Sequence, residues 1–267
     1  MKKTLIALAL AAGLTSFAGN AKAQIDINTQ YRGYYFSYIN GGTNPAGTSY
    51  NWTTTGAASQ ANTGGTSPIT TIWNSYFVFD LTGLNGNLIS SVNLKLNTPG
   101  NGNELVYNPA TFQIFDATSQ VPNLTTNTAA YNIYPDNASS VIAGLTSGTS
   151  WGTTTFNVND SRLNISLNDA GVLAIKNYIN AGTNTIAIGA QVDNASTYAS
   201  AAYLNGNTNV DGISWETTLD SHPIGGPSDG LTKLTVTMAP EPSTYALFGL
   251  GALVLVVAYR VRIQKVA

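Results

Sequence analysis

Few side chains in this chain could perform acid–base or nucleophilic chemistry. His222 is the only histidine, and the absence of cysteine removes thiolate catalysis, disulfide bonds and cysteine-ligated metals. His222 stands in "DSHPIGGPSDG", a stretch of turn residues, with Asp220, Ser221 and Asp229 nearby in sequence. Because catalytic triads are recognised by geometry and not by adjacency, we interpret His222 as a solvated loop residue. The sequence also lacks a Gly-rich phosphate loop, a zinc-ligand spacing and a serine nucleophile elbow.

The carboxylates show no catalytic pairing, although glycoside hydrolysis needs two of them at a set separation. Glu104 and Glu216 are the only glutamates before the C-terminal segment. Asp80 ends an aromatic run, and we interpret it as a buried strand-end residue that accepts backbone hydrogen bonds. Four acidic residues in one loop-rich stretch could offer oxygen ligands to a structural Ca²⁺, although their spacing matches no EF-hand: Asp211, Glu216, Asp220 and Asp229. We predict a non-enzymatic protein with no catalytic residue, metal or cofactor, and keep the Ca²⁺ site as an alternative.

Aromatic side chains point more clearly to a ligand, because sugar-binding proteins stack sugar rings on Trp and Tyr. Three of the four tryptophans, Trp52, Trp151 and Trp215, follow or occupy polar, loop-like sequence. The other interpretation is that these rings pack over the ends of a β-sandwich. The candidates for glycan contact are Trp52, Trp151, Trp215, Tyr34 and Tyr35.

Short alternating apolar runs between turn residues predict the strands that would position these side chains. "SYFVFDL" (75–81) is largely apolar on both faces, as in a central strand, and "SVNLKLN" (91–97) alternates cleanly. Only "NDAGVLAIKNYINAG" has helical spacing, with Asn168 able to cap its start and Gly182 to end it. We predict an all-β fold, a single jelly-roll-like β-sandwich with one short helix at about 168–181.

The region between the two hydrophobic ends, residues 24–238, is acidic and forms one domain in this interpretation. It has five Lys and Arg against twelve Asp and Glu, whereas the whole chain has a formal net charge of −2. An acidic domain with scattered cations argues against nucleic-acid binding, which needs a clustered cationic face. Its surface polarity comes from Asn, Thr, Ser and Gly, which suits an extracellular, polysaccharide-rich setting.

The N-terminal segment, residues 1–23, predicts a removable secretory signal peptide. Two lysines precede an apolar run that is too short to span a membrane. Ala21 and Ala23 form an A-x-A cleavage site before Gln24. We therefore expect the secretion machinery to export the chain.

The C-terminal segment "APEPSTYALFGLGALVLVVAYRVRIQK" (239–265) combines a proline-rich collar, an apolar run and a basic tail. Prolines fix φ and favour extended backbone before them, so the collar is open to a processing enzyme. We predict a short transmembrane helix at about 244–261, with a cytoplasmic basic end. The collar residues are Pro240, Glu241, Pro242, Ser243 and Thr244, and the basic stop consists of Arg260, Arg262 and Lys265.

This tail resembles the PEP-CTERM sorting signal of exported proteins in Gram-negative bacteria that make extracellular polysaccharide. The resemblance implies processing by an exosortase, a membrane-embedded protease or transpeptidase. In the body, "NSYFVFDLTGLNGNLISSVNLKLNTPGNG" and "LNISLNDAGVLAIKNYINAGTNTIAIGAQV" resemble exported, carbohydrate-binding-module-like sandwiches, although "IAIGA" departs from the usual ending of that pattern. The second resemblance implies fold more than activity.

Together these features predict an exported surface or matrix protein with a structural or glycan-binding role in exopolysaccharide or biofilm. The inner membrane would hold it transiently, with the domain in the periplasm, until an exosortase acts on the tail. Its partners would be the exosortase, the secretion machinery and extracellular polysaccharide, but no nucleic acid. Two alternatives stay open: a polysaccharide-active hydrolase or lyase on the same sandwich, and a permanently membrane-anchored surface protein.

Overall fold

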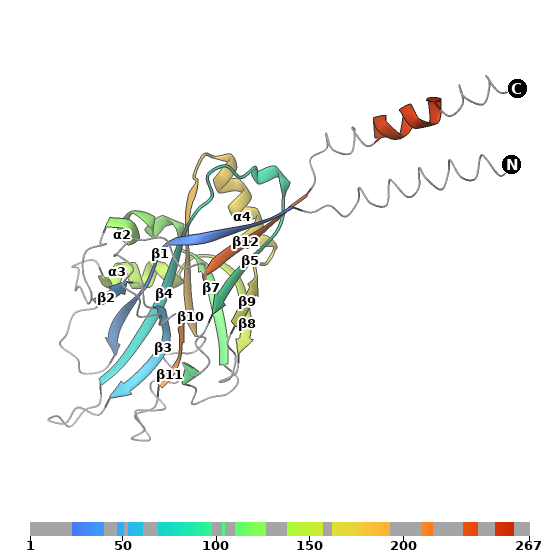
Figure 1. Cartoon of the computed structure of the whole chain (residues 1–267). Helices are drawn as coiled ribbons and strands as arrows, with labels where there is room; N and C mark the ends of the chain where they lie inside the picture. The colour runs from blue at the N-terminus through green and yellow to red at the C-terminus, as the bar shows by residue number, and fades with distance from the viewer. Residues whose placement is uncertain are drawn as a thin grey trace, which may run out of the picture.

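A computed structural model of the chain shows a mostly β-stranded body with a few short helices (Figure 1). The structure describes residues 23–39, 47–50, 53–60, 69–97, 103–104, 110–126, 138–156, 162–192, 210–215, 232–239 and 249–258. The strands are β1 (Ala23–Ile39), β2 (Gly47–Tyr50), β3 (Thr53–Gln60), β4 (Ile69–Asp80), β5 (Ile89–Asn97), β6 (Asn103–Glu104), β7 (Ala110–Asp116), β8 (Ser150–Phe156), β9 (Arg162–Ser166), β10 (Thr185–Val192), β11 (Val210–Trp215) and β12 (Lys233–Met238). The helices are α2 (Val121–Thr126), α3 (Ala138–Thr146) and α4 (Asp169–Asn180), with 3₁₀ turns η1 (Gly86–Leu88) and η2 (Thr118–Gln120).

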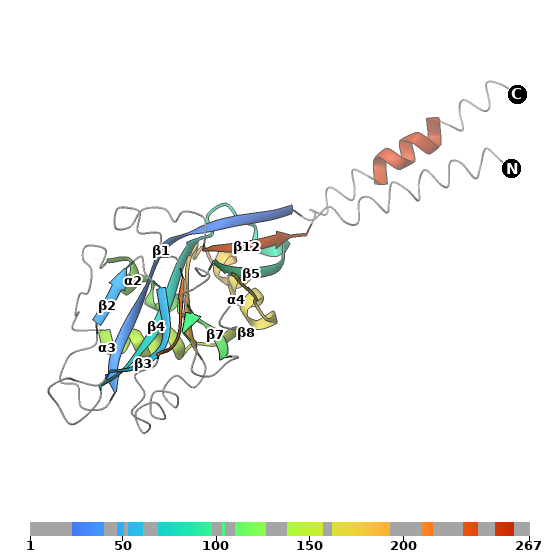
Figure 2. The ribbon, with the colours of Figure 1, turned by 60° about the horizontal axis from the view of Figure 1, so that its bottom comes forward.

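Eight of these strands form two antiparallel layers in the order of a jelly roll. One layer runs β1-β12-β5-β9, and the other runs β4-β10-β7-β8. The first and last strands are therefore neighbours, as Figures 1 and 2 show. The remaining short strands extend the second layer, because β2 pairs with β1, β3 pairs with β4, and β11 lies between β3 and β6.

Strand β1 belongs to both layers and makes the sheet continuous. Its first residues pair with β12, and after an irregularity between Thr29 and Tyr31 it pairs with β4. At the opposite side the backbone N–H of Asn168 donates to the carbonyl of Trp151 at 2.7 Å, which brings β8 beside the end of β9. The predicted all-β fold is confirmed, and the nearly closed sheet places it between a sandwich and a barrel.

The core lies between the two layers and follows from strand alternation. In β5, Val92, Leu94 and Leu96 are buried while the intervening residues are partly exposed, as the pattern of "SVNLKLN" predicts. In β4, residues 74–79 are buried on both faces, which fits its central place. One face contributes Phe77 and Phe79 to the core between the layers, and the other packs against helices.

Helix α4 matches the prediction closely. Asn168 is its N-cap, and the side chain accepts a hydrogen bond from the Gly171 N–H at 2.9 Å. Gly182 follows the helix with φ of 80°, a conformation that glycine adopts without a Cβ penalty. Ile175 is buried, and this face of the helix covers the core between the layers.

The prediction of only one short helix is wrong, because α2, α3 and the two 3₁₀ turns lie in the body as well. Helix α3 covers the outer face of β4 and β10, where Val141 and Leu145 pack in one cluster with Tyr76 and Val78. Its sequence "ASSVIAGLT" contains Ser, Gly and Thr, which are weak helix formers, so helix propensity does not predict a helix at these residues. Burial of its apolar side against the sheet stabilises it instead.

Candidate functional site: the tail junction and the polar sheet face

The C-terminal segment leaves the body directly from a hydrogen-bonded strand end. Met238 pairs with Ala23 of β1 on one side and with Ile89 of β5 on the other. The next residue, Ala239, donates its backbone N–H to the Leu88 carbonyl at 2.6 Å. Because β1 begins where β12 ends, the N-terminal and C-terminal segments join the body at one end of the same layer (Figure 2).

Beyond this junction the structure describes a helix over residues 249–258, which lies inside the predicted range of 244–261. Its apolar side chains are largely exposed, with Leu250 at 60% and Leu253 at 62% of their full accessible area. None of the helices that the structure describes is long and apolar enough to cross a membrane. The predicted collar residues 240–244 and the basic residues Arg260, Arg262 and Lys265 lie outside the described residues.

The outer face of the β1-β12-β5-β9 layer is polar, and we call it the polar sheet face. Directly paired residues on antiparallel strands share a face, so the strand register defines its members. Its three cross-strand rows are Gln24, Thr237 and Ser91; Asp26, Thr235, Asn93 and Ser166; and Asn28, Lys233, Lys95 and Asn164. The sequence signal for this face was the set of polar positions that alternate with buried ones in "SVNLKLN" and "RLNISLN".

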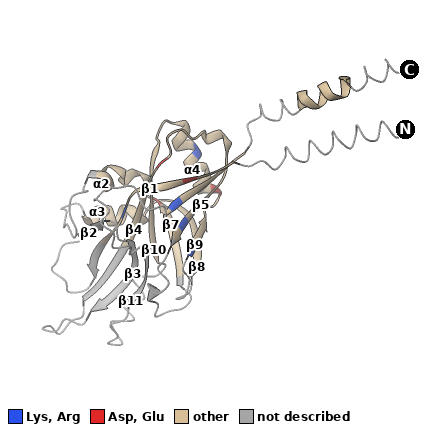
Figure 3. Cartoon of the chain, viewed as in Figure 1, with Lys and Arg blue, Asp and Glu red and all other residues tan. Residues whose placement is uncertain are grey.

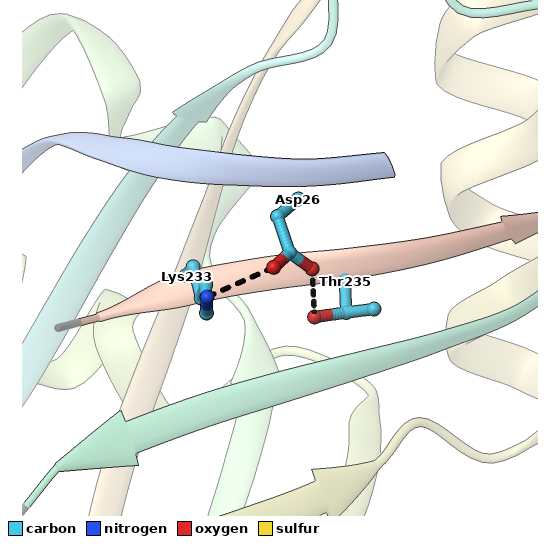
Figure 4. A network of polar contacts seen from close by, with 3 residues as sticks. All are labelled: Asp26, Lys233 and Thr235. Atoms are coloured by element: carbon cyan, nitrogen blue, oxygen red, sulfur yellow. Dashed lines mark hydrogen bonds and ion pairs between the residues drawn. The ribbon is translucent and has the colours of Figure 1, made fainter. Parts of the chain in front are cut away.

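An ion pair organises the β1–β12 side of this face (Figure 4). Lys233 Nζ lies 2.8 Å from Asp26 Oδ2, and the Thr235 hydroxyl donates to Asp26 Oδ1 at 2.6 Å. The hydrogen bond from Lys233 and, to a smaller extent, the hydrogen bond from Thr235 hold the pKa of the Asp26 carboxyl below its usual value. The Asp26 side chain is 40% exposed, so the pair lies in partial contact with solvent.

The β5–β9 side of the polar sheet face is built from uncharged groups beside a lysine. The Ser166 hydroxyl donates to Asn93 Oδ1 at 2.7 Å. Lys95 lies in register with Asn164 on one side and with Lys233 on the other. Eight of the eleven residues in the three rows carry an amide or a hydroxyl and three are charged, so amides and hydroxyls dominate what this face offers a ligand. Figure 3 shows the charged residues of the described body.

The structure corrects two of the predicted glycan contacts. Trp151 and Tyr35 are both fully buried, so their rings have no face open to a sugar. Trp151 belongs to the core between the layers, and Tyr35 lies in the cluster that α3 covers. Tyr34 is half-buried, the side chain of Trp215 in β11 is not described, and Trp52 lies outside the described residues.

Asp80 and Asp116 each have local structural partners. Asp80 accepts from the Thr82 hydroxyl and, at 2.9 Å, from the Thr82 backbone N–H, which confirms the predicted backbone hydrogen bond at a strand end. These bonds, chiefly that from the hydroxyl, lower the pKa of Asp80. The expectation that Asp80 is buried is wrong, because its side chain at the strand end is only partly covered. Asp116 accepts a hydrogen bond from the Tyr178 hydroxyl at 2.8 Å. The pKa of Tyr178 is raised mainly by burial and also by this hydrogen bond.

The predicted Ca²⁺ alternative and the loop histidine are largely beyond the described part of the chain. His222, Glu216, Asp220 and Asp229 lie outside it, and Asp211 lies in β11. Among the residues that the structure describes, no group of three or more His, Cys, Asp or Glu side chains could hold a metal ion.

Comparison with known proteins identifies the C-terminal segment. Residues 239–262 match the family described as the PEP-CTERM protein-sorting motif, so the chain carries this motif in the place that the sequence predicted. Such a motif is the mark of an exported surface protein of Gram-negative bacteria that an exosortase processes. No curated protein matches the chain.

Proposed function

We propose that this protein is exported, held briefly at the inner membrane by its C-terminal segment, and then processed by an exosortase toward the cell surface or the extracellular matrix. The observation that carries the proposal is the PEP-CTERM motif at residues 239–262, joined directly to the last strand of an all-β body. The exposed apolar side chains of residues 249–258 support a transient hold in lipid.

The experiment compares the mature mass of the protein in a host with its exosortase and in one without it. We expect the tail to be lost only when the enzyme is present. Replacing Pro240, Glu241 and Pro242 together with alanine should leave the tail in place, whereas Pro122→Ala in α2 should change nothing. A tail that persists in both hosts would contradict the proposal and favour a permanent anchor.

We further propose a non-enzymatic, structural or glycan-contacting role in the extracellular polysaccharide, with the polar sheet face as the contact surface. Three features support this role: its amides and hydroxyls, its position on the layer opposite to the one that α3 covers, and the ordering of Asp26 and Asn93 by hydrogen bonds. Uncharged donors and acceptors on a rigid sheet can match sugar hydroxyls with little loss of side-chain freedom.

A glycan array and a pull-down with isolated exopolysaccharide test this role on residues 24–239. We expect the combined Lys95→Ala and Asn164→Ala variant to lose most binding, because both residues lie in one row of the face. The matched control combines Asn177→Ala and Ser119→Ala, two exposed polar positions on α4 and η2. Equal binding by both variants would show that this face is not the contact surface.

A further inference from the structure

We propose that the end of the body from which the tail leaves contacts the processing enzyme directly, as a second recognition surface beside the sorting motif. This exit face consists of Gln24, Asn87, Leu88, Ser90, Asn180 and Ala239. The inference rests on the proposed function, because it assigns a surface of the body to the enzyme that processes the tail.

The matched motif follows the fold without a spacer. Ala239 is both the first residue of the matched motif and a residue whose N–H is bonded to Leu88 at 2.6 Å. Its neighbour Met238 pairs with β1 and β5 on its two sides, at the strand spacing of about 4.8 Å. An enzyme that closes around the backbone just beyond Ala239 therefore meets the ends of the flanking strands.

The segment between the body and the apolar helix is short. Residues 240–248 separate Ala239 from the apolar helix, and at about 3.3–3.6 Å per residue they can extend over at most about 32 Å. While the apolar segment lies in lipid, the exit face must stay within that distance of it. The body is therefore held with this end toward the membrane, where a membrane-embedded enzyme acts.

The exit face is uncharged and its polar groups are ordered. The body is acidic overall, yet no member of the exit face is charged. Its polar groups are fixed in place, since Asn180 Nδ2 donates to Asn87 Oδ1 at 3.2 Å and the Ser90 hydroxyl donates to the Thr237 carbonyl at 3.0 Å. An ordered, uncharged surface can dock on a protein partner without the like-charge repulsion that the rest of an acidic body could bring.

The test measures the rate of tail loss by pulse-chase for the full chain in a host with its exosortase. One variant carries a flexible Gly-Ser spacer inserted between Ala239 and Pro240, and a second combines Asn87→Asp with Asn180→Asp. The matched control combines Ser119→Asp with Ser139→Asp, two exposed residues of η2 and α3 that lie outside both the exit face and the polar sheet face. Equal export of the four chains checks that the substitutions leave folding intact.

We expect the spacer and the exit-face variant each to slow processing severalfold, and the control to match the unmodified chain. Processing at the unmodified rate in both test variants would overturn the docking surface while leaving the proposed function in place. Faster processing with the spacer would overturn it too, because the body would then obstruct the enzyme. An unmodified chain that keeps its tail in the presence of the enzyme would overturn both proposals.

Discussion

Trp151 is fully buried although polar or small residues flank it in "SWGTTTF". Its ring packs beneath α4, where Gly171 lies close enough that an added Cβ would come within 2.9 Å of Trp151 Cγ. Trp151→Ala should lower the free energy of unfolding by about 3–5 kcal/mol, as for large-to-small changes in a core, and Trp151→Phe by less. Urea unfolding checks both values. Loss of glycan binding at unchanged stability would contradict the buried position.

The Asp26–Lys233 pair gives a pH-dependent prediction. The pKa of Asp26 is lower in the folded chain than the usual 3.8, so the pair stabilises the fold above that value. This contribution is lost as the pH falls through the folded pKa. Because both side chains are about a third or more exposed, Asp26→Asn should cost at most about 1 kcal/mol at neutral pH.

Urea unfolding of Asp26→Asn and the unmodified protein at neutral pH and at the lowest pH at which both stay folded measures this difference. We expect the two proteins to differ at neutral pH and to converge in acid, and Lys233→Met to behave in the same way. A difference of equal size at both pH values would mean that the substitution acts through packing and not through charge.

At the scale of single residues, sequence reasoning succeeded where a local pattern decides the outcome. Asp80 and Asn168 make the backbone hydrogen bonds that their positions predicted. It failed for Trp151 and Tyr35, because their surroundings come from elements far along the chain. Tyr35 is buried partly by the cluster around α3. Because helix propensity does not predict α3, the burial of Tyr35 in this cluster could not be predicted either.

At the scale of elements, the contact between α3 and β10 depends on one glycine in "IAIGA". A Cβ at Gly189 would overlap the carbonyl of Leu145 in α3, so α3 can lie this close to β10 only because residue 189 has no side chain. Gly189→Ala should therefore displace α3 and lower the free energy of unfolding by about 1–3 kcal/mol, the usual cost of overpacking. Hydrogen exchange should show faster exchange in α3 than in β5. Unchanged exchange in α3 would contradict the close approach.

The strands were more predictable than the helices, for a physical reason. Alternation in "SVNLKLN" reports burial of one face directly, and the termini of α4 carry their own cap and glycine signals. Helix α3 lacks such signals, and its stability comes from the sheet beneath it. The layer order could not be read from the sequence either, because the pairing of β1 with β12 joins residues more than 200 positions apart.

At the scale of the whole molecule, the pairing of β12 with β1 and β5 determines how much of the C-terminal segment can be removed without unfolding the body. Strand β12 lies between β1 and β5, and it buries Leu234 and Val236 fully and Met238 nearly so. Each such side chain contributes about 1.5–3 kcal/mol, so together they rival the total stability of an ordinary domain, about 5–15 kcal/mol. The fold therefore needs strand β12 through Met238, and the matched motif begins at the next residue, Ala239.

A chain of residues 24–239 should unfold cooperatively in urea, with the same midpoint as the body in the full-length protein. A chain of residues 24–232 should show no cooperative transition, because its central strand is missing. Circular dichroism measures both, and Met238→Ala in the longer chain should fall between them. A stable chain ending at residue 232 would show that β12 is dispensable. Removal of the sorting segment beyond Ala239 should thus release an intact fold, as a processed surface protein requires.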